Sequence, residues 1–114
     1  MKKKENNSEK KFLIPGEKLE ILIERNMGCI ASDMITVQGY KVGYMYREEC
    51  EASYDSGWRF FAGIEDQLYA DNPDNFSFYN LNTIANYDID IIAFLELPVG
   101  TTLERNNGKL ILAK

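Results

Sequence analysis

The chain of 114 residues is 45% hydrophobic and 12% aromatic, which is typical of one globular domain and excludes a chain that is disordered throughout. Its net charge of −5 is uneven: residues 1–11 hold five lysines against two glutamates, or +3, which leaves −8 for the remainder. An acidic body argues against nucleic acid and favours a basic protein as partner, although solubility alone also accounts for such a charge. No apolar run approaches the ~20 residues of a membrane span, and no signal-peptide core follows the N-terminal lysines, so we expect a cytoplasmic protein without a membrane partner.

The N-terminal part is predicted to contain a tail and a helix. Residues 1–11 are polar and lysine-rich with no apolar face, so we expect a disordered basic tail ahead of a single domain over residues 12–114. Pro and Gly at residues 15–16 open a predicted helix over residues 17–25, in which leucine and isoleucine recur at helical spacing.

From residue 28 the hydrophobic period changes towards two, which is typical of strands. We expect a strand over residues 28–32, a hairpin with arms at 35–37 and 40–48 around a glycine turn, a polar loop over 49–56, a turn at 55–57 and a strand over 58–61. Trp58 and Phe60 face the core in this pattern. Because each connection is short, these strands are predicted to form an antiparallel meander.

The C-terminal half alternates short helical and extended segments. We expect a helix within residues 65–70, packing by Phe76, Phe78 and Tyr79 on a short strand or irregular segment, a helical turn at 82–86, a helix over 89–95 capped by Asp88, and a hairpin of residues 101–105 and 109–112 around Asn107-Gly108. Asparagines at five positions are expected to satisfy irregular backbone rather than to contact a ligand: Asn72, Asn75, Asn80, Asn82 and Asn86. The fold class is α+β, with antiparallel hairpins and an N-terminal helix and one or two short helices packed on them.

The chain contains no histidine, and this limits its chemistry. The usual Ser–His and Cys–His nucleophile systems and histidine metal sites are excluded, and no P-loop, G-x-G-x-x-G or G-x-S-x-G motif is present. We therefore expect no enzyme activity, no catalytic residues, no metal site and no cofactor. Cys29 and Cys50 are expected to be free thiols rather than a disulfide.

Charged residues near one end of the predicted meander form the first candidate site. Arg47, Glu48, Asp55 and Arg59 can make a recognition patch or an anion site, since arginine matches carboxylates in geometry. They can equally make a structural network in which Arg59 pairs with Asp55 or Glu48 beside Trp58, and the two interpretations are compatible.

Two further groups have a functional and a structural interpretation. The acidic residues Glu65, Asp66, Asp71 and Asp74 can bind a hard cation or supply an acid–base pair, but we favour an ordinary solvated loop. The aromatic residues can form an exposed anchor for a partner, or alternation can place one set of them in the core; they are Tyr44, Tyr46, Trp58, Phe60 and Phe61.

Several ordered motifs resemble a bacterial family that was catalogued as a domain of unknown function and later as immunity protein family thirty-three. The resemblance spans residues 27–105. The motifs that carry it are Gly28-Cys-Ile-Ala-Ser-Asp33, Val42-Gly-Tyr-Met-Tyr-Arg-Glu48, Asp55-Ser-Gly-Trp-Arg-Phe-Phe61, Asn72-Pro-Asp-Asn75, Leu81-Asn-Thr-Ile-Ala-Asn-Tyr-Asp88 and Leu103-Glu-Arg105.

This resemblance implies a non-enzymatic immunity protein of a bacterial polymorphic-toxin system, which binds and neutralises a cognate toxin; the acidic body favours a basic toxin. The expected partner-binding residues are Tyr46, Arg47, Glu48, Asp55, Trp58, Arg59, Glu65 and Asp66. Two alternatives are a regulatory domain that binds a small molecule or metal through these charged groups, and a housekeeping regulatory domain with no toxin partner.

Overall fold

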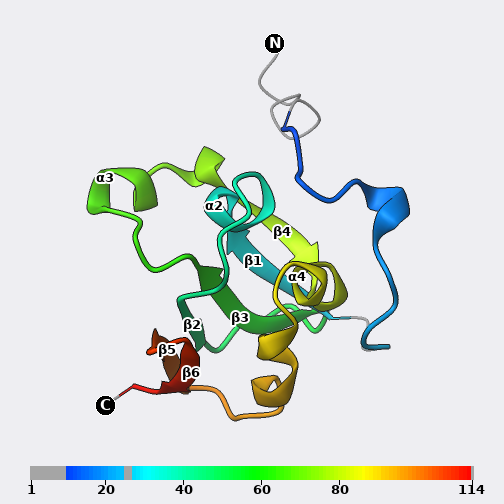
Figure 1. Ribbon diagram of the computed structural model, residues 1–114. Helices are drawn as coiled ribbons and strands as arrows, with labels where there is room; N and C mark the ends of the chain where they lie inside the picture. The colour runs from blue at the N-terminus through cyan, green and yellow to red at the C-terminus, as the bar shows by residue number, and fades with distance from the viewer. Residues whose placement is uncertain (1–9, 25–26, 114) are drawn as a thin grey trace.

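A six-stranded mixed sheet forms the centre of the computed structural model, which describes residues 10–24 and 27–113 (Figure 1). The strands are β1 (Gly28–Ser32), β2 (Tyr44–Arg47), β3 (Asp55–Phe61), β4 (Phe76–Asn80), β5 (Thr102–Asn106) and β6 (Lys109–Leu112). Their order across the sheet is β4-β1-β3-β2-β5-β6. The β1–β3 pair is parallel and the other four pairs are antiparallel.

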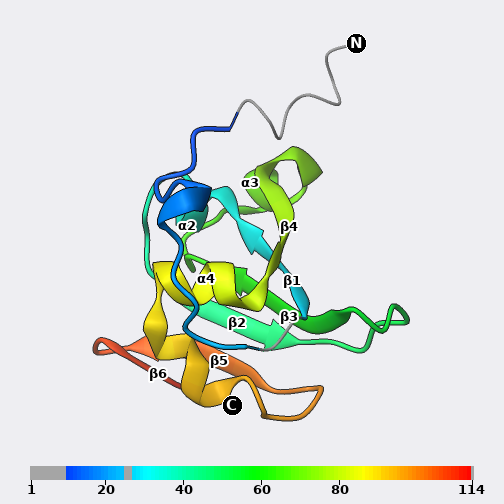
Figure 2. The same ribbon diagram turned by 90° about the vertical axis from the view of Figure 1, so that its right-hand side faces the viewer.

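Short helices complete the domain and confirm the α+β class. They are α2 (Asp33–Thr36), α3 (Gln67–Ala70) and α4 (Leu81–Tyr87), with the 3₁₀ helices η2 (Gly16–Lys18), η3 (Pro73–Asn75) and η4 (Ile89–Phe94). The α4 helix and the η4 segment that follows it lie on one face of the sheet (Figure 2). No helix in the described part of the chain is long and apolar enough to cross a membrane.

The core lies between this face of the sheet and the helices. Alternation along β3 turns Trp58 and Phe60 inwards, and both side chains are fully buried, as predicted. They pack in one cluster with buried side chains of the other elements, among them Cys29, Ala31, Ile35, Met45, Leu81, Ile84, Ile91 and Leu103. Cys29 and Cys50 are free thiols, as expected, and burial raises the pKa of Cys29.

The predicted helix over residues 17–25 is wrong for the part that the structure describes. One 3₁₀ turn forms at Gly16–Lys18 and residues 19–24 are not helical, while residue 25 lies outside the described residues. Side-chain amides of α4 take the place of helical carbonyls: Asn82 Oδ1 accepts from Leu22 N and Ile23 N, at 2.7 and 3.0 Å. The expectation that such asparagines satisfy irregular backbone is confirmed here.

The predicted hairpin of residues 35–37 and 40–48 is also wrong. Ser32 caps α2 by accepting a hydrogen bond from Met34 N, so residues 33–36 turn into a helix instead of a strand. Only residues 44–47 of the second arm form a strand, and it pairs with β3 and β5. Because β1 pairs with β3 in parallel and with β4, the strands do not form a simple meander.

Two predictions that depend on local turn and capping signals are confirmed. Asp88 caps η4 by accepting from Asp90 N, although the segment is a 3₁₀ helix rather than an α-helix. Asn107 and Gly108 have φ angles of 54° and 81° and join β5 to β6. Of the predicted tail, residues 1–9 lie outside the described residues, and the ammonium group of Lys10 lies 2.9 Å from the Asp33 carboxylate.

Candidate functional site

The face of the sheet opposite the core carries a row of aromatic side chains. Alternation places Tyr44 and Tyr46 of β2 and Phe61 of β3 on this face, and the ring centroids of Tyr44 and Tyr46 lie 5.7 and 6.0 Å from that of Phe61. Phe76 of β4 meets Phe61 edge to face at 5.6 Å. Phe78, which is 49% exposed, shares the same face of β4 with Phe76, and its ring meets that of Tyr54 edge to face at 5.9 Å. We call Tyr44, Tyr46, Phe61, Phe76 and Phe78 the aromatic face.

A bulge in β3 shapes the middle of this face. Between the paired positions Gly28–Asp55 and Ile30–Arg59, the register of the β1–β3 pair is interrupted, so four residues of β3 span what two residues of β1 span. Gly57 has a φ of 88°, and its N–H donates to Asp55 Oδ1 at 2.9 Å. The segment predicted as a turn at 55–57 is therefore a bulge within a strand.

The bulge brings Asp55 within reach of Arg59. The Arg59 nitrogens Nη1 and Nη2 donate to the two Asp55 carboxylate oxygens at 3.0 and 2.9 Å, and Nε donates to Glu48 Oε2 at 2.7 Å. Burial lowers the pKa of Arg59, but the hydrogen bonds to Asp55 and Glu48 outweigh it and raise the pKa. The structural network foreseen from the sequence is present, with Glu48 as its exposed end.

Asp55 is expected to make the free energy of unfolding depend on pH in the acid range. Its hydrogen bonds from Arg59 lower the pKa of the Asp55 carboxyl, which burial only partly offsets. A carboxylate with a lowered folded pKa stabilises the protein above its unfolded pKa of about 4, and this contribution is lost as the pH falls through the folded value. We expect Asp55→Asn to weaken the loss of stability below pH ~4, measured by urea unfolding, whereas the exposed-site control Asp71→Asn should keep the wild-type slope.

Arg47 and Trp58 lie on the core side of the sheet. Arg47 Nε donates to the Ser56 carbonyl and Nη1 to the Leu97 carbonyl, each at 2.8 Å, and its guanidinium carbon lies 5.9 Å from the centre of the Trp58 ring. Trp58 Nε1 donates to the Leu95 carbonyl at 3.1 Å. Of these two residues predicted to bind a partner, Trp58 is fully buried and Arg47 is partly exposed, and both make contacts within the protein.

The acidic residues after β3 are used in local turns. Glu65 accepts from Ala62 N and Gly63 N at 2.8 and 2.9 Å, and Asp66 caps α3 by accepting from Tyr69 N. No group of three or more acidic or cysteine side chains in the described ranges is placed to hold a metal ion.

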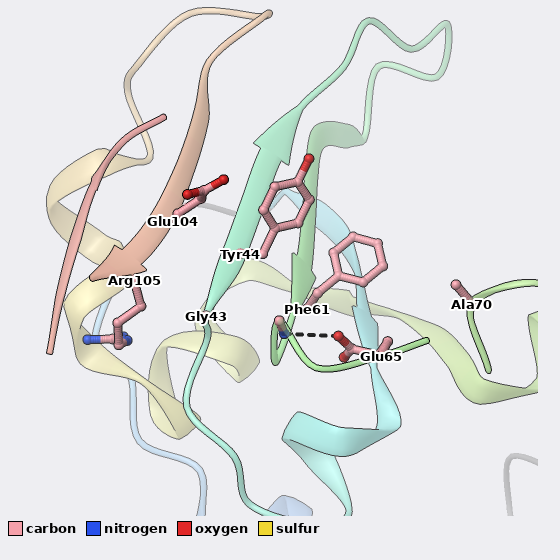
Figure 3. A pocket seen from close by; sticks show the side chains of 8 residues that line it. Gly43, Tyr44, Phe61, Glu65, Ala70, Glu104 and Arg105 are labelled. Atoms are coloured by element: carbon pink, nitrogen blue, oxygen red, sulfur yellow. Dashed lines mark hydrogen bonds between the residues drawn. The ribbon is translucent and has the colours of Figure 1, made fainter. Parts of the chain in front are cut away.

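An open pocket of about 420 Å³ lies at one end of the aromatic face (Figure 3). Tyr44, Phe61, Glu65 and Glu104 are among the residues that line it. Glu104 lies opposite Tyr44 in the β2–β5 pair, so β5 places a carboxylate-bearing residue beside the Tyr44 ring. Sequence reasoning missed Glu104 as a site residue, because only the long-range pairing of β2 with β5 brings it there.

The geometry defines a small α+β domain with one packed face and one aromatic face. Over residues 29–113 the sequence matches the family described as Immunity protein Imm33 domain. The chain therefore belongs to the Imm33 family of immunity proteins, as its motifs indicated. No curated protein matches the chain, and no solved structure matches it.

Proposed function

We propose that this chain is an immunity protein that neutralises a cognate bacterial toxin by binding to it directly, without catalysing a reaction. Membership of the Imm33 family over residues 29–113 is the observation that carries the proposal. The aromatic face supports it, because tyrosine and phenylalanine on a rigid sheet supply contact area at low conformational cost. The toxin would be met in the cytoplasm of the producing cell or its kin.

Binding and catalysis can be distinguished by stoichiometry. Expression of this chain together with the toxin encoded by the neighbouring gene should restore growth of a sensitive bacterial host. With purified proteins, inhibition of the toxin should titrate to a fixed molar ratio, with a Kd of about 1 nM or tighter, and denaturation of the complex should release toxin of unchanged mass. Complete inhibition by a small fraction of an equivalent, or a toxin of altered mass, would contradict a binding mechanism.

A further inference from the structure

We infer that the aromatic face is the surface that docks the protein partner, and that the pocket at its end receives a lysine or arginine side chain of that partner. The inference rests on the proposed function, since it takes the partner to be a protein. It adds a location and a chemistry: a basic side chain enters the pocket lined by the rings of Tyr44 and Phe61, with the Glu104 carboxylate on the β5 side of the rings and that of Glu65 on the other side (Figure 3).

The aromatic face has the composition of an interface rather than of an ordinary surface. Four of its rings, those of Tyr44, Tyr46, Phe61 and Phe76, are linked across strands β2, β3 and β4 by centroid distances of 5.6 to 6.0 Å. Most of them are partly exposed, and Phe78 is half exposed. Contiguous apolar patches of this kind usually mark interaction sites, and aromatic side chains dominate the binding energy of such sites.

The two arginines next to the aromatic face do not make it positively charged, because both are paired with carboxylates of this chain. Arg59 is held by Asp55 and Glu48, and this group of three carries a net charge of −1. Arg105 also lines the pocket, but its guanidinium turns away from Glu104 and pairs with Asp88 and Asp90 (Figure 3). Both arginines are thus paired with carboxylates of this chain.

The carboxylate of Glu104 is free to receive an external cation. Its side chain is exposed, and it makes no hydrogen bond or ion pair with any residue in the described ranges. Glu65 adds a second negative charge to the pocket, and its position is fixed by the backbone N–H groups of Ala62 and Gly63.

A lysine or arginine side chain suits this combination of groups. Its charged head can pair with Glu104, while its alkyl stem and the positive charge pack against the faces of the Tyr44 and Phe61 rings. The charge of −8 over residues 12–114 favours the approach of a basic partner from solution. A second copy of this chain fits poorly, because a symmetric dimer through this face would bring two negatively charged faces together.

The test measures the affinity of purified variants for the toxin encoded by the neighbouring gene. We expect Glu104→Lys to weaken binding by about tenfold or more, because it places a like charge against the incoming side chain. Glu17→Lys is the matched control: it changes the net charge equally, lies in η2 away from the pocket, and should change the affinity less than about twofold. Melting temperatures of both variants should remain near that of the wild type.

Each outcome gives a separate answer. Failure of the wild-type chain to bind or to protect overturns the proposed function, and this surface assignment falls with it. Protection by the wild-type chain with unchanged affinity of Glu104→Lys overturns the docking surface alone. Equal weakening by Glu104→Lys and Glu17→Lys shows that only overall charge matters and rejects the pocket. A wild-type dimer that Glu104→Lys dissociates identifies the face as a self-association surface and also rejects the inference.

Discussion

Replacing Trp58 by alanine is expected to lower the free energy of unfolding by about 3–5 kcal/mol. The side chain is fully buried, stacks on Phe60 with ring centroids 6.3 Å apart, and donates a hydrogen bond to the Leu95 carbonyl. It links β3 to the segment after η4, so the substitution removes apolar contact, leaves a cavity and strands a buried carbonyl. Since single domains are stable by only about 5–15 kcal/mol, this one change removes a large share of the total.

Urea unfolding followed by far-ultraviolet circular dichroism measures this loss, because the substitution removes the only tryptophan fluorophore. Trp58→Phe keeps an aromatic ring but cannot donate to Leu95, and should cost about 1–3 kcal/mol. Leu68→Ala is the exposed control: the Leu68 side chain is 82% exposed, and the change should stay within about 0.5 kcal/mol. A small effect of Trp58→Ala would mean that the packing of the core does not depend on the tryptophan.

The parts of the fold that the sequence predicts well are those fixed by neighbouring residues. The turn at Asn107-Gly108 needs positive φ angles that these residue types adopt readily, and Asp88 caps the segment that immediately follows it. The inward direction of Trp58 and Phe60 follows from alternation alone. In each case the physical cause lies within a few residues of the feature.

Two of the wrong predictions involve partners that are far away in the sequence, and a third involves a local cap. Leucine and isoleucine recur at helical spacing in the predicted helix over residues 17–25. The side-chain amides of Asn82 and Asn86, however, accept hydrogen bonds from the backbone of residues 20–23 and hold it in another conformation. Pairing of β1 with β3 is parallel and non-local, and no short-range pattern specifies it. The capping of α2 by Ser32 was a local signal that could have been recognised, since serine before aspartate is typical of a helix start.

The candidate site also has one part that could be predicted from nearby residues and one part that depends on distant ones. The network of Asp55, Arg59 and Glu48 could be foreseen because the oppositely charged residues lie close together in the chain, on or beside one strand. The pocket could not be foreseen, because it depends on β5 lying beside β2 and so placing Glu104 opposite Tyr44. The residues that lie beside a carboxylate on an exposed strand cannot be predicted until the pairing of the strands is known.

Gly57→Ala is the second substitution expected to have a large effect, about 2–5 kcal/mol of destabilisation. The φ of 88° at Gly57 is unfavourable for any residue with a Cβ atom, and a Cβ built there would lie 2.1 Å from the backbone carbonyl oxygen of Glu48. Because that oxygen belongs to the chain next to β3, relief of the clash requires the backbone at Glu48 to move away from the bulge. The Glu48 end of the Arg59 network should be displaced with it.

Gly108→Ala separates the cost of the positive φ from the cost of the clash with the Glu48 carbonyl oxygen. Gly108 has a similar φ of 81°, but a Cβ atom there would meet nothing within 4 Å, so this variant measures the cost of the backbone conformation alone, about 1–2 kcal/mol. Urea unfolding of both variants should show the larger loss for Gly57→Ala, and the excess is the cost of separating the bulge from Glu48. Equal losses would show that the backbone at Glu48 yields without cost, in which case the close approach at Gly57 does not hold the Arg59 network in place.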